Sequence, residues 1–282
     1  MTTSSLDALC AAVDQAFEQG VREANEVTEP LVARFLRALE AGELRAATCV
    51  DGQWCVNPVV KRGILLGFRI GSIVDQSAGL PFADKHTFGV LTPDFAARGV
   101  RIVPGGSSIR SGACIGRSVT LMPPCYVNVG AWVGDGTMVD SHALVGSCAQ
   151  VGARVHLSAA AQLGGVLEPV GMRPVIIEDD CLIGGNTGVY EGTLVRTGAV
   201  LGAGVVLTAS VPVYDLVHQT ILRATADSPL EIPAGAVVVA GTRPVRGSTF
   251  ATEAGLSLNC AIIVKYRDDR TDLRAALEGD LR

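Results

Sequence analysis

An aliphatic residue recurs at every sixth position of this chain, first from Ile115 to Leu163 and again from Ile177 to Leu207. A small or β-branched residue lies two positions before each of them, as at Ala113 and Val205. Because alternate residues of a strand share one face, both positions point inward. Glycine often follows the aliphatic residue, where the backbone is expected to turn sharply. This repeat of six predicts a β-solenoid, an all-β fold.

The composition fits one elongated subunit with an aliphatic interior. Aromatic residues make up only 5% of the 282 residues, so Val, Leu, Ile and Ala must fill a narrow core. The balance of 23 basic against 28 acidic residues gives a net charge of −5, which argues against a nucleic-acid partner. No apolar stretch approaches the roughly 20 residues that span a bilayer, and the first residues do not resemble a signal peptide. We therefore expect a cytoplasmic protein without a membrane partner.

The cysteines and histidines do not suggest a metal site or a disulfide framework. The chain has eight cysteines but no C-x-x-C pair, and Cys125 and Cys181 fall on the small inward position of the repeat. Free thiols in a reducing compartment are therefore expected. A zinc site of three histidines is not expected, because only His142 and His156 fall within the repeats.

The chain divides into three parts. Helical spacing of apolar residues predicts two helices before Ala41-Gly42, and a third helix is expected at 58–66, followed by short strands at 68–74. The step of fourteen residues from Leu163 to Ile177 marks a loop inserted around 168–174. We expect a mainly helical N-terminal cap at residues 1–100, the solenoid at 101–240, and an extension of strands and a charged helix at 241–282.

Three hexads form one coil if the solenoid has three flat sides. With about 18 residues per coil, the hexads make about five coils, and strands roughly 4.8 Å apart give a prism on the order of 25 Å tall. Parallel crossovers are normally right-handed. The aliphatic-Gly-x-x-small-x hexad, however, is similar to that of the left-handed β-helix acyltransferases. We therefore predict a left-handed parallel β-helix of hexapeptide repeats.

Longer segments carry a more specific resemblance. They are D-G-Q-W (51–54), G-T-M-V-D (136–140), V-G-S-C-A-Q-V-G (145–152), V-H-L-S (155–158), G-G-V-L-E-P (164–169), I-I-E-D (176–179), P-A-G-A-V-V-V-A-G (233–241) and C-A-I-I-V-K (260–265). On these segments the chain resembles the bacterial tetrahydrodipicolinate N-succinyltransferase family of lysine and diaminopimelate biosynthesis. The resemblance implies a homotrimer that transfers a succinyl group from coenzyme A to the amine of ring-opened tetrahydrodipicolinate, 2-amino-6-oxopimelate, in clefts between subunits.

The resemblance places two acidic residues in the catalytic site, Asp140 of G-T-M-V-D and Glu191 of the V-x-E-G segment. Only the free base of an amine attacks a thioester, so a carboxylate that orients the ammonium and accepts its proton suits this chemistry. By the repeat alone, Asp140 is better explained as a solvated corner residue, and the resemblance reverses that preference. Counting in coils puts the two acids on different sides of the prism. They share a site only if neighbouring subunits each lend one.

The residues expected to bind the substrate depart from the family pattern. Ser141 and His142 stand where the family has Thr-Trp, Asn186 and Thr187 stand where it has Arg-Ser, and Ser158 begins S-A-A-A-Q-L-G-G in place of S-G-G-x-G-I-G-G. A charge-assisted contact contributes roughly 1.5–3 kcal/mol. Loss of the arginine at Asn186 therefore predicts that acetyl-CoA serves at least comparably with succinyl-CoA.

The resemblance also implies that coenzyme A lies between adjacent prisms near the C-terminal coils. The residues expected to contact it are Gly202, Ala203, Gly204 and Thr208 through exposed backbone, and Arg243 and Arg246 of a following loop through the phosphates. The glycines here lack the strand-turn-helix setting of a dinucleotide fingerprint. Cys148 has no histidine close by in sequence to activate it as a covalent acyl carrier, and direct transfer needs none.

Three alternatives stay open at this point. His156 precedes the inward Leu157, should face outward, and offers a different base, while the role of His142 is open. The chain is also compatible with a divergent acetyl-CoA-dependent N-acetyltransferase of secondary metabolism, similar to those of tabtoxin-type pathways. The third alternative is a non-catalytic solenoid that serves as an assembly subunit. Release of the coenzyme A thiol from acyl-CoA, tested across small amino dicarboxylates, distinguishes the last two alternatives from a succinyltransferase.

Overall fold

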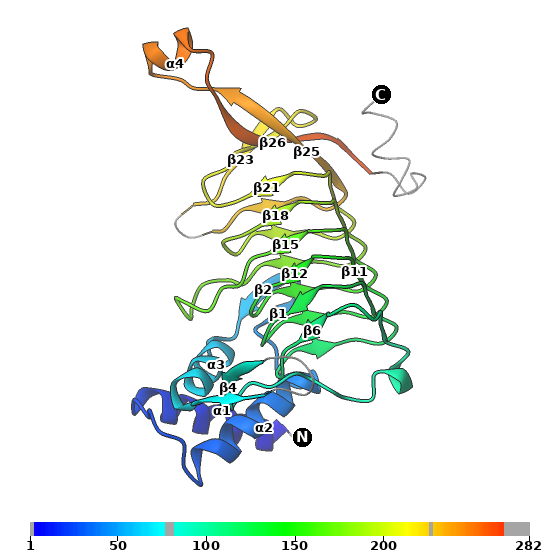
Figure 1. Ribbon diagram of the computed structural model, residues 1–282. Helices are drawn as coiled ribbons and strands as arrows, with labels where there is room; N and C mark the ends of the chain where they lie inside the picture. Colours follow the sequence, from blue (N-terminus) through cyan, green and yellow to red (C-terminus); the bar gives the residue numbers. More distant parts are fainter. Residues whose placement is uncertain (1–2, 77–81, 226–227, 268–282) are drawn as a thin grey trace.

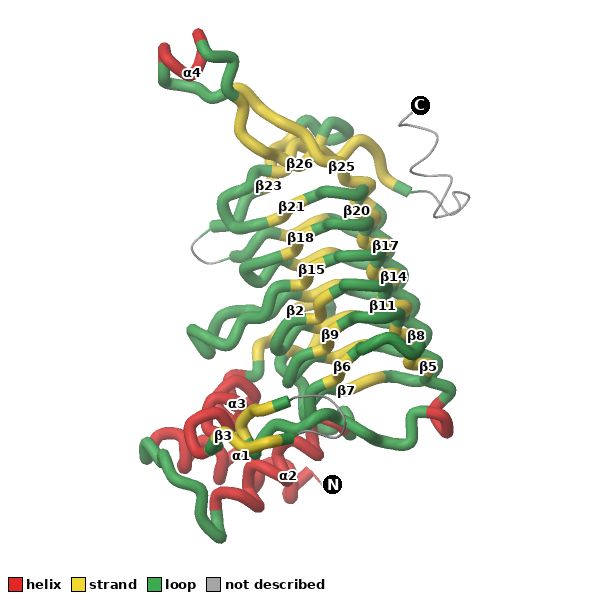
Figure 2. The backbone as a smooth tube through the Cα atoms, viewed as in Figure 1, coloured by secondary structure: helices red, strands yellow, loops and turns green. Residues whose placement is uncertain are grey.

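The computed structural model describes residues 3–76, 82–225 and 228–267. The chain forms a three-sided parallel β-helix with a helical domain at one end and a hairpin arm at the other (Figure 1). Short strands stack in columns along the prism, and turns form its edges (Figure 2). In these three ranges, no helix has the length and apolar character needed to cross a membrane. The solenoid predicted from the hexads is confirmed.

Every coil of the prism visits three faces in the same order, named A, B and C here. Face A holds β5 (Arg101–Ile102), β8 (Thr120–Leu121), β11 (Met138–Val139), β14 (His156–Leu157), β17 (Leu182–Ile183) and β20 (Val200–Leu201), and continues into β25 (Ala236–Pro244), β26 (Ser257–Tyr266), β22 (Val213–Asp215) and β23 (Thr220–Leu222). Face B holds β6 (Ser108–Ile109), β9 (Tyr126–Val127), β12 (Leu144–Val145), β15 (Gln162–Leu163), β18 (Gly188–Val189) and β21 (Val206–Leu207). Face C holds β7 (Cys114–Ile115), β10 (Trp132–Val133), β13 (Gln150–Val151), β16 (Ile176–Ile177), β19 (Leu194–Val195) and β24 (Glu231–Ile232).

The strand register fixes the number of coils and the size of the inserted loop. Val133 pairs with Val151, 18 residues on, whereas Val151 pairs with Ile177, which is 26 residues on. The loop between β15 and β16 therefore adds eight residues at the corner between faces B and C. Faces B and C each contain six strands, so the prediction of about five coils was one coil short. The additional coil comes from strands at the two ends of the prism. β5 and β6 precede the recurring aliphatic residues, and β24 follows a long connecting segment after β21.

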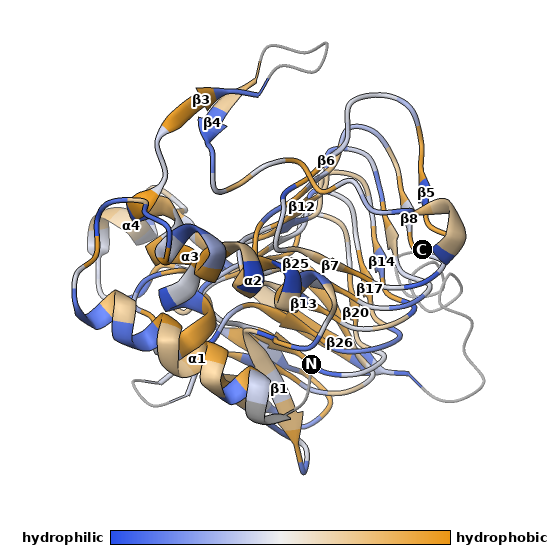
Figure 3. Cartoon of the chain, turned by 90° about the horizontal axis from the view of Figure 1, so that it is seen from below, coloured by the Kyte–Doolittle hydropathy of each residue, from blue (hydrophilic) through white to orange (hydrophobic). Residues whose placement is uncertain are grey.

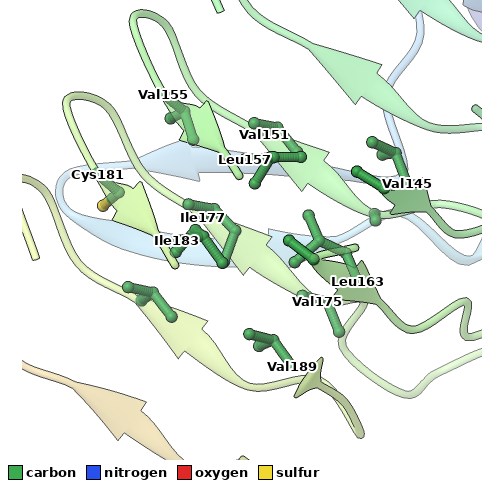
Figure 4. Packing of buried hydrophobic residues seen from close by; sticks show 14 of the residues in the cluster. Val145, Val151, Val155, Leu157, Leu163, Val175, Ile177, Cys181, Ile183 and Val189 are labelled. Carbon is green, nitrogen blue, oxygen red and sulfur yellow. The ribbon is translucent and has the colours of Figure 1, made fainter. Parts of the chain in front are cut away.

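The interior of the prism consists of the predicted inward residues. Each aliphatic residue of the six-residue repeat has at most 1% of its surface exposed, and the small residues two positions earlier are also buried. Leu157 on face A, Leu163 on face B and Ile177 on face C point toward one another across the prism (Figure 4). An inward hydroxyl finds a backbone partner, because Thr137 Oγ1 donates to Gly152 O at 2.8 Å. The cross-section is too narrow for aromatic rings, which explains the low aromatic content.

Glycines after the aliphatic residues serve a different purpose from the one predicted. Gly134 has an ordinary φ, but a Cβ there would lie 2.5 Å from the backbone carbon of Gly152 in the next coil. The glycine is therefore required by the close stacking of the coils. The sharp turns fall on other residues, including His142, Asn186 and Glu191, which adopt φ values of 63°, 55° and 54°.

The N-terminal domain contains α1 (Thr3–Glu18), α2 (Thr28–Glu40) and α3 (Pro58–Ile70). Seen from below, the helices gather on one side of the prism (Figure 3). α3 is longer than predicted, so Phe68 is helical, and only β3 (Ile73–Asp75), paired with β4 (Ala83–Lys85), matches the strands expected nearby. The sequence reading missed a further hairpin of β1 (Ala47–Val50) and β2 (Gln53–Val56), which turns at Asp51-Gly52. A short 3-10 helix, η1 (Ala96–Arg98), precedes the first coil.

The β1–β2 hairpin docks the N-terminal domain on face C. Trp54 Nε1 donates to Glu178 Oε1 at 2.8 Å, and the Arg45 guanidinium lies 3.9 Å from the ring centroid of Trp132. Lys61 of α3 is completely buried and donates through Nζ to the carbonyl of Met172 in the inserted loop. The helical domain and the prism are therefore joined by polar as well as apolar contacts.

The arm consists of β25 and β26 with α4 (Thr249–Glu253) at its tip (Figure 1). β25 continues across residue 240, the predicted boundary between the solenoid and the C-terminal extension. The charged C-terminal helix expected in that extension falls on residues 268–282, outside the described part of the chain.

The burial of the recurring aliphatic residues predicts that inward substitutions lower the free energy of unfolding much more than outward ones. Leu157→Ala removes a side chain with no exposed surface, and we expect the free energy of unfolding to fall by about 2–5 kcal/mol. Met138→Ala on the outside of face A, where 37% of the residue is exposed, should change it by less than about 1 kcal/mol. Denaturant unfolding measures both, and equal losses would contradict the assigned inward register.

A buried carboxylate holds the upper end of face A together. Asp215 Oδ2 accepts from Tyr266 Oη at 2.6 Å and bonds to His218 Nδ1 at 2.8 Å, while Oδ1 accepts the backbone N–H groups of Val217 and His218. Burial alone raises the pKa of Asp215, but these hydrogen bonds outweigh it and lower the pKa to about 2 from its ordinary 3.8. The ionised carboxylate is thus the form that the fold stabilises.

The pKa of Asp215 predicts acid sensitivity of the arm end. Because the folded-state pKa lies below the unfolded value, the stabilisation is fully present above about pH 4 and is lost as the pH falls toward about 2. Asp215→Asn should be less stable at neutral pH and should lose less stability than the parent between these values. Urea unfolding at several pH values, with Asp7→Asn on α1 as control, tests this, and identical pH profiles would exclude the assigned role.

Candidate active site

Most of the predicted site residues lie on the corner between faces A and B, where Asp140, Ser158 and Gly202 occupy equivalent positions and Asn186 lies two positions further along. Backbone N–H groups donate to corner carbonyls in the coil before: His142 to Pro124 at 2.6 Å, Ala160 to Ser141 at 2.8 Å, Asn186 to Ala159 at 3.0 Å and Gly204 to Gly185 at 2.9 Å. Counted from β5, Asp140 lies in the third coil, Ser158 in the fourth, Asn186 in the fifth and Gly202 in the sixth. With coils about 4.8 Å apart, Asp140 and Gly202 lie roughly 14 Å apart along the corner.

Asp140 directly follows the buried Val139, which fixes its backbone at the start of the corner. Its Oδ1 accepts the N–H of Ser141 at 2.7 Å. No donor among the described residues is bonded to Oδ2, and the residue is partly exposed. One carboxylate oxygen therefore orients the side chain and the other is available to a ligand.

The predicted substrate-binding residues divide into exposed and buried ones. His142 and Asn186 are exposed on the corner, and Ser141 and Ser158 are half-buried there. Thr187 is different, because it is fully buried and its Oγ1 donates to Gly202 O at 3.2 Å inside the prism. The Thr187 side chain cannot reach a ligand on the corner and is left out of the proposed site.

His156 lies on face A, next to Met138 of the preceding coil. Its Nε2 is buried and has no hydrogen-bond partner among the described residues. The outward orientation predicted for this residue is correct. The competing base is therefore close to the corner but on the neighbouring face.

Glu191 lies at a different corner, between faces B and C, as the coil count predicts. Its Oε2 accepts the N–H of Ala209 in the next coil at 2.6 Å. Thr208 also lies at this corner, and its hydroxyl is 3.1 Å from that of Ser210. Within one chain, Glu191 thus stabilises a turn and does not approach Asp140.

The upper end of the A/B corner leaves one carbonyl without a coil above it. The N–H of Gly204 continues the corner ladder by bonding to Gly185, but Ala203 O, the next acceptor in the series, receives no hydrogen bond from the described residues. A Cβ on Gly204 would meet nothing within 4 Å. Open backbone here can accept an amide N–H of an extended ligand.

The two arginines expected to hold phosphates lie on the arm. Arg243 belongs to β25 and not to a loop, which corrects the sequence reading, and its Nε is buried without a partner among the described residues. Arg246 is exposed between β25 and α4. The strand that begins in the A-V-V-V-A run is longer than predicted, because β26 pairs with β25 from residue 236 to residue 244.

One aromatic residue whose ring lies over face B was not anticipated. Tyr190 follows β18, and its ring lies where a side chain on Gly188 would be: an added Cβ would be 2.5 Å from Cε2 and 2.9 Å from the hydroxyl oxygen. The signal in the sequence was the glycine at an outward strand position. The presence of Tyr190 in the sequence did not indicate this contact with Gly188, because the contact depends on the conformation of the tyrosine side chain.

A cavity of about 770 Å³ lies elsewhere, on face C beneath the β1–β2 hairpin. Its lining includes Trp54, Trp132, Arg45 and Glu178, which form the docking contacts of the N-terminal domain. Asp140, Ser158 and Asn186 are not among the residues that line it.

Cys148 is unsuited to covalent catalysis. It has no exposed surface, and burial raises the pKa of its thiol to about 12 although the nearby Lys61 ammonium lowers it. The thiolate is the nucleophile, so the residue is unreactive at neutral pH. All eight cysteines are free, and no cluster of three or more potential metal ligands occurs within the described ranges.

Comparisons with known proteins agree with this architecture. Residues 8–70 match a family model described as the N-terminal part of tetrahydrodipicolinate N-succinyltransferase, and residues 174–209 match the hexapeptide repeat of succinyl-transferase. The 2,3,4,5-tetrahydropyridine-2,6-dicarboxylate N-succinyltransferase of Idiomarina loihiensis is 40% identical over 275 residues, 95% of each chain. That of Paramagnetospirillum magneticum is 41% identical over 288 residues, 99% of each chain.

A solved structure supports the fold. It comes from Campylobacter jejuni, is described as a candidate 2,3,4,5-tetrahydropyridine-2-carboxylate N-succinyltransferase, and has a TM-score of 0.54 at 16% identity, covering 82% of this chain and 62% of that one. Together these findings define a hexapeptide-repeat transferase with the predicted left-handed parallel β-helix. The chain belongs to the tetrahydrodipicolinate N-succinyltransferase family.

The burial of Cys148 predicts selective thiol labelling. Cys49 and Cys55 are exposed on the β1–β2 hairpin and should react with iodoacetamide in the folded protein, whereas Cys148 should react only after unfolding. Peptide mass spectrometry of protein labelled with and without urea measures the difference. Labelling of Cys148 at the rate of Cys49 in the native state would show that the thiol is accessible.

Proposed function

We propose that this protein is an acyl-CoA-dependent N-acyltransferase that acts on tetrahydrodipicolinate as 2-amino-6-oxopimelate, or on a similar amino dicarboxylate. The observation that carries the proposal is the gathering of Asp140, Ser158, Asn186 and Gly202 on successive coils of the A/B corner. The names of the full-length relatives support the same reaction class. No metal takes part in the proposed chemistry.

The acceptor amine is placed at Asp140. Its free Oδ2 can bind the ammonium and accept one proton, after which the nitrogen lone pair attacks the thioester carbonyl carbon. The new N–C bond forms, the C–S bond breaks, and coenzyme A leaves as its thiol after taking up a proton. Ser141 and His142 in the same coil and Ser158 in the next offer hydrogen bonds to the acceptor.

Coenzyme A is placed above the acceptor on the same corner. Its pantetheine amides would pair with the free backbone near Ala203 and Gly204, and its phosphates with the guanidinium groups of Arg243 and Arg246 on an arm of the same or a neighbouring chain. Thr208 would contact the coenzyme from the B/C corner of an adjacent subunit. The acyl carbon then lies at the level of Ser158 and Asn186.

The shared use of two corners favours a homotrimer. Asp140 and Glu191 lie on different corners of one prism, and a threefold axis can bring the A/B corner of one subunit against the B/C corner of the next. Glu191 would then contribute to the acceptor site across the boundary. A corner of a three-sided prism projects outward, so a second subunit packed against it would also shield the proposed site from water.

The donor is proposed to be acetyl-CoA as well as succinyl-CoA. From the second to the sixth coil, the described A/B corner contains no lysine or arginine, and Asn186 is neutral. A succinyl carboxylate therefore finds no cation on this corner, and burying it unpaired is unfavourable. The lack of a cation on this corner also favours a second candidate function, that of an acetyltransferase of secondary metabolism of the tabtoxin-pathway type.

Donor kinetics test the proposal directly. With 2-aminopimelate as acceptor, kcat/KM for acetyl-CoA should be at least comparable with that for succinyl-CoA, measured by release of the coenzyme A thiol. A preference for succinyl-CoA above about tenfold, equal to about 1.4 kcal/mol, would instead indicate an ordinary lysine-pathway succinyltransferase. Absence of release with either donor would favour the non-catalytic assembly subunit.

The shared site predicts complementation between inactive subunits. Asp140→Asn and Glu191→Gln keep the acceptors of Ser141 N and Ala209 N but remove the charges, and each should lower kcat/KM about 10²–10⁴-fold. Random mixed trimers refolded from equal amounts should regain about a quarter of the parent activity, because one site in four receives both native acids. Mixed trimers without any recovery would show that the two acids do not share a site.

A further inference from the structure

The ring of Tyr190 takes the place of a missing side chain on face B. The outward residues at the starts of successive face B strands are Tyr126, Leu144, Gln162, Gly188 and Val206, which lie side by side in the register. Gly188 is the one without a side chain. The Tyr190 ring turns back over it, with Cε2, Cζ and Oη all within 3.0 Å of the position that a Cβ would occupy.

A second glycine completes the space that the ring needs. Gly164 precedes the loop in the coil below, and a Cβ there would lie 2.7 Å from Cδ1 of Tyr190. Gly164 follows Leu163, which pairs with Val189, so the two glycines border the ring from different coils. The ring therefore occupies space that a methyl group at either position would require.

The phenol end of the ring lies over Gly188. Gly188 is preceded by Asn186 and Thr187 of that corner, and the hydroxyl lies 2.9 Å from the Cβ position at 188, away from the Tyr190 backbone. None of the described residues forms a hydrogen bond to this hydroxyl, and the residue is only half-buried. A bulky, neutral group thus lies over Gly188 on face B of the fifth coil, two residues along the chain from Asn186, beside which the acyl carbon is proposed to lie.

We propose that Tyr190 is a specificity-determining residue that limits the length of the transferred acyl group. This inference rests on the proposed function, because it requires the thioester to lie beside Ser158 and Asn186. A two-carbon acyl group leaves the ring in place, whereas a four-carbon group with a terminal carboxylate must pass over it. The phenol offers a neutral hydroxyl and no positive charge, so it cannot pair with that carboxylate as an arginine would.

The bulk of the ring, and not its hydroxyl, is the property that this argument uses. Tyr190→Ala should open the space over Gly188 and raise the ratio of kcat/KM for succinyl-CoA to kcat/KM for acetyl-CoA by about tenfold or more. Tyr190→Phe keeps the bulk and should leave the ratio within about threefold of the parent. The ratio compares two donors in one preparation, so it does not depend on the fraction of each variant that is folded.

Tyr126→Ala serves as the matched control, since Tyr126 lies in the same outward column but three coils below Gly188. It should leave the donor ratio unchanged. Turnover with an unchanged ratio in Tyr190→Ala, or an equal change in Tyr190→Phe, would overturn the inference alone. Absence of turnover with both donors in the parent and all variants would reject the proposed function, and the inference with it.

Discussion

The regular stacking of short parallel strands is the constraint on which the rest of this structure depends. Each coil must repeat the backbone path of the previous one closely enough for hydrogen bonds to connect them at every face and corner. The interior is consequently so narrow that only aliphatic and small side chains fit, and Gly134 cannot carry even a methyl group without meeting Gly152. Side chains that project outward are not subject to this restriction.

Acidic residues at the corners accept hydrogen bonds that join the stacked coils. Asp135 Oδ1 accepts the N–H of Arg117 at 2.7 Å, Asp179 Oδ1 accepts that of Ala153 at 2.9 Å, and Glu191 Oε2 accepts that of Ala209 at 2.6 Å. Each of these bonds joins two coils. Asp140 differs, because it accepts only from Ser141, its own neighbour, and no coil-to-coil bond occupies it. An acid at a corner is thus not by itself a sign of catalysis, and the free oxygen of Asp140 distinguishes it.

The regular backbone also turns a set of distant residues into a linear site. Residues separated by one coil along the chain become neighbours on the corner, so Asp140, Ser158 and Gly202 occupy equivalent positions, and Asn186 lies two positions further along the corner in the fifth coil. An extended coenzyme suits such a line better than a closed pocket does. The reacting groups then differ in height along the prism, and side chains on the adjacent face, such as Tyr190 over Gly188, can act at one level without disturbing the others.

The sequence by itself determined the inward residues, the parallel β-helix and the separation of Asp140 from Glu191, because a strict period of six leaves only one way to bury the aliphatic trains. It missed the β1–β2 hairpin although Asp51-Gly52 is a strong turn signal, and it assigned Thr187 to a surface while its place in the period was inward. Only the tertiary structure decided that the inserted loop adds eight residues, that Arg243 lies in a strand, and that the Tyr190 ring covers Gly188. These features depend on side-chain conformation and on contacts between separate coils, which periodicity along one chain does not specify.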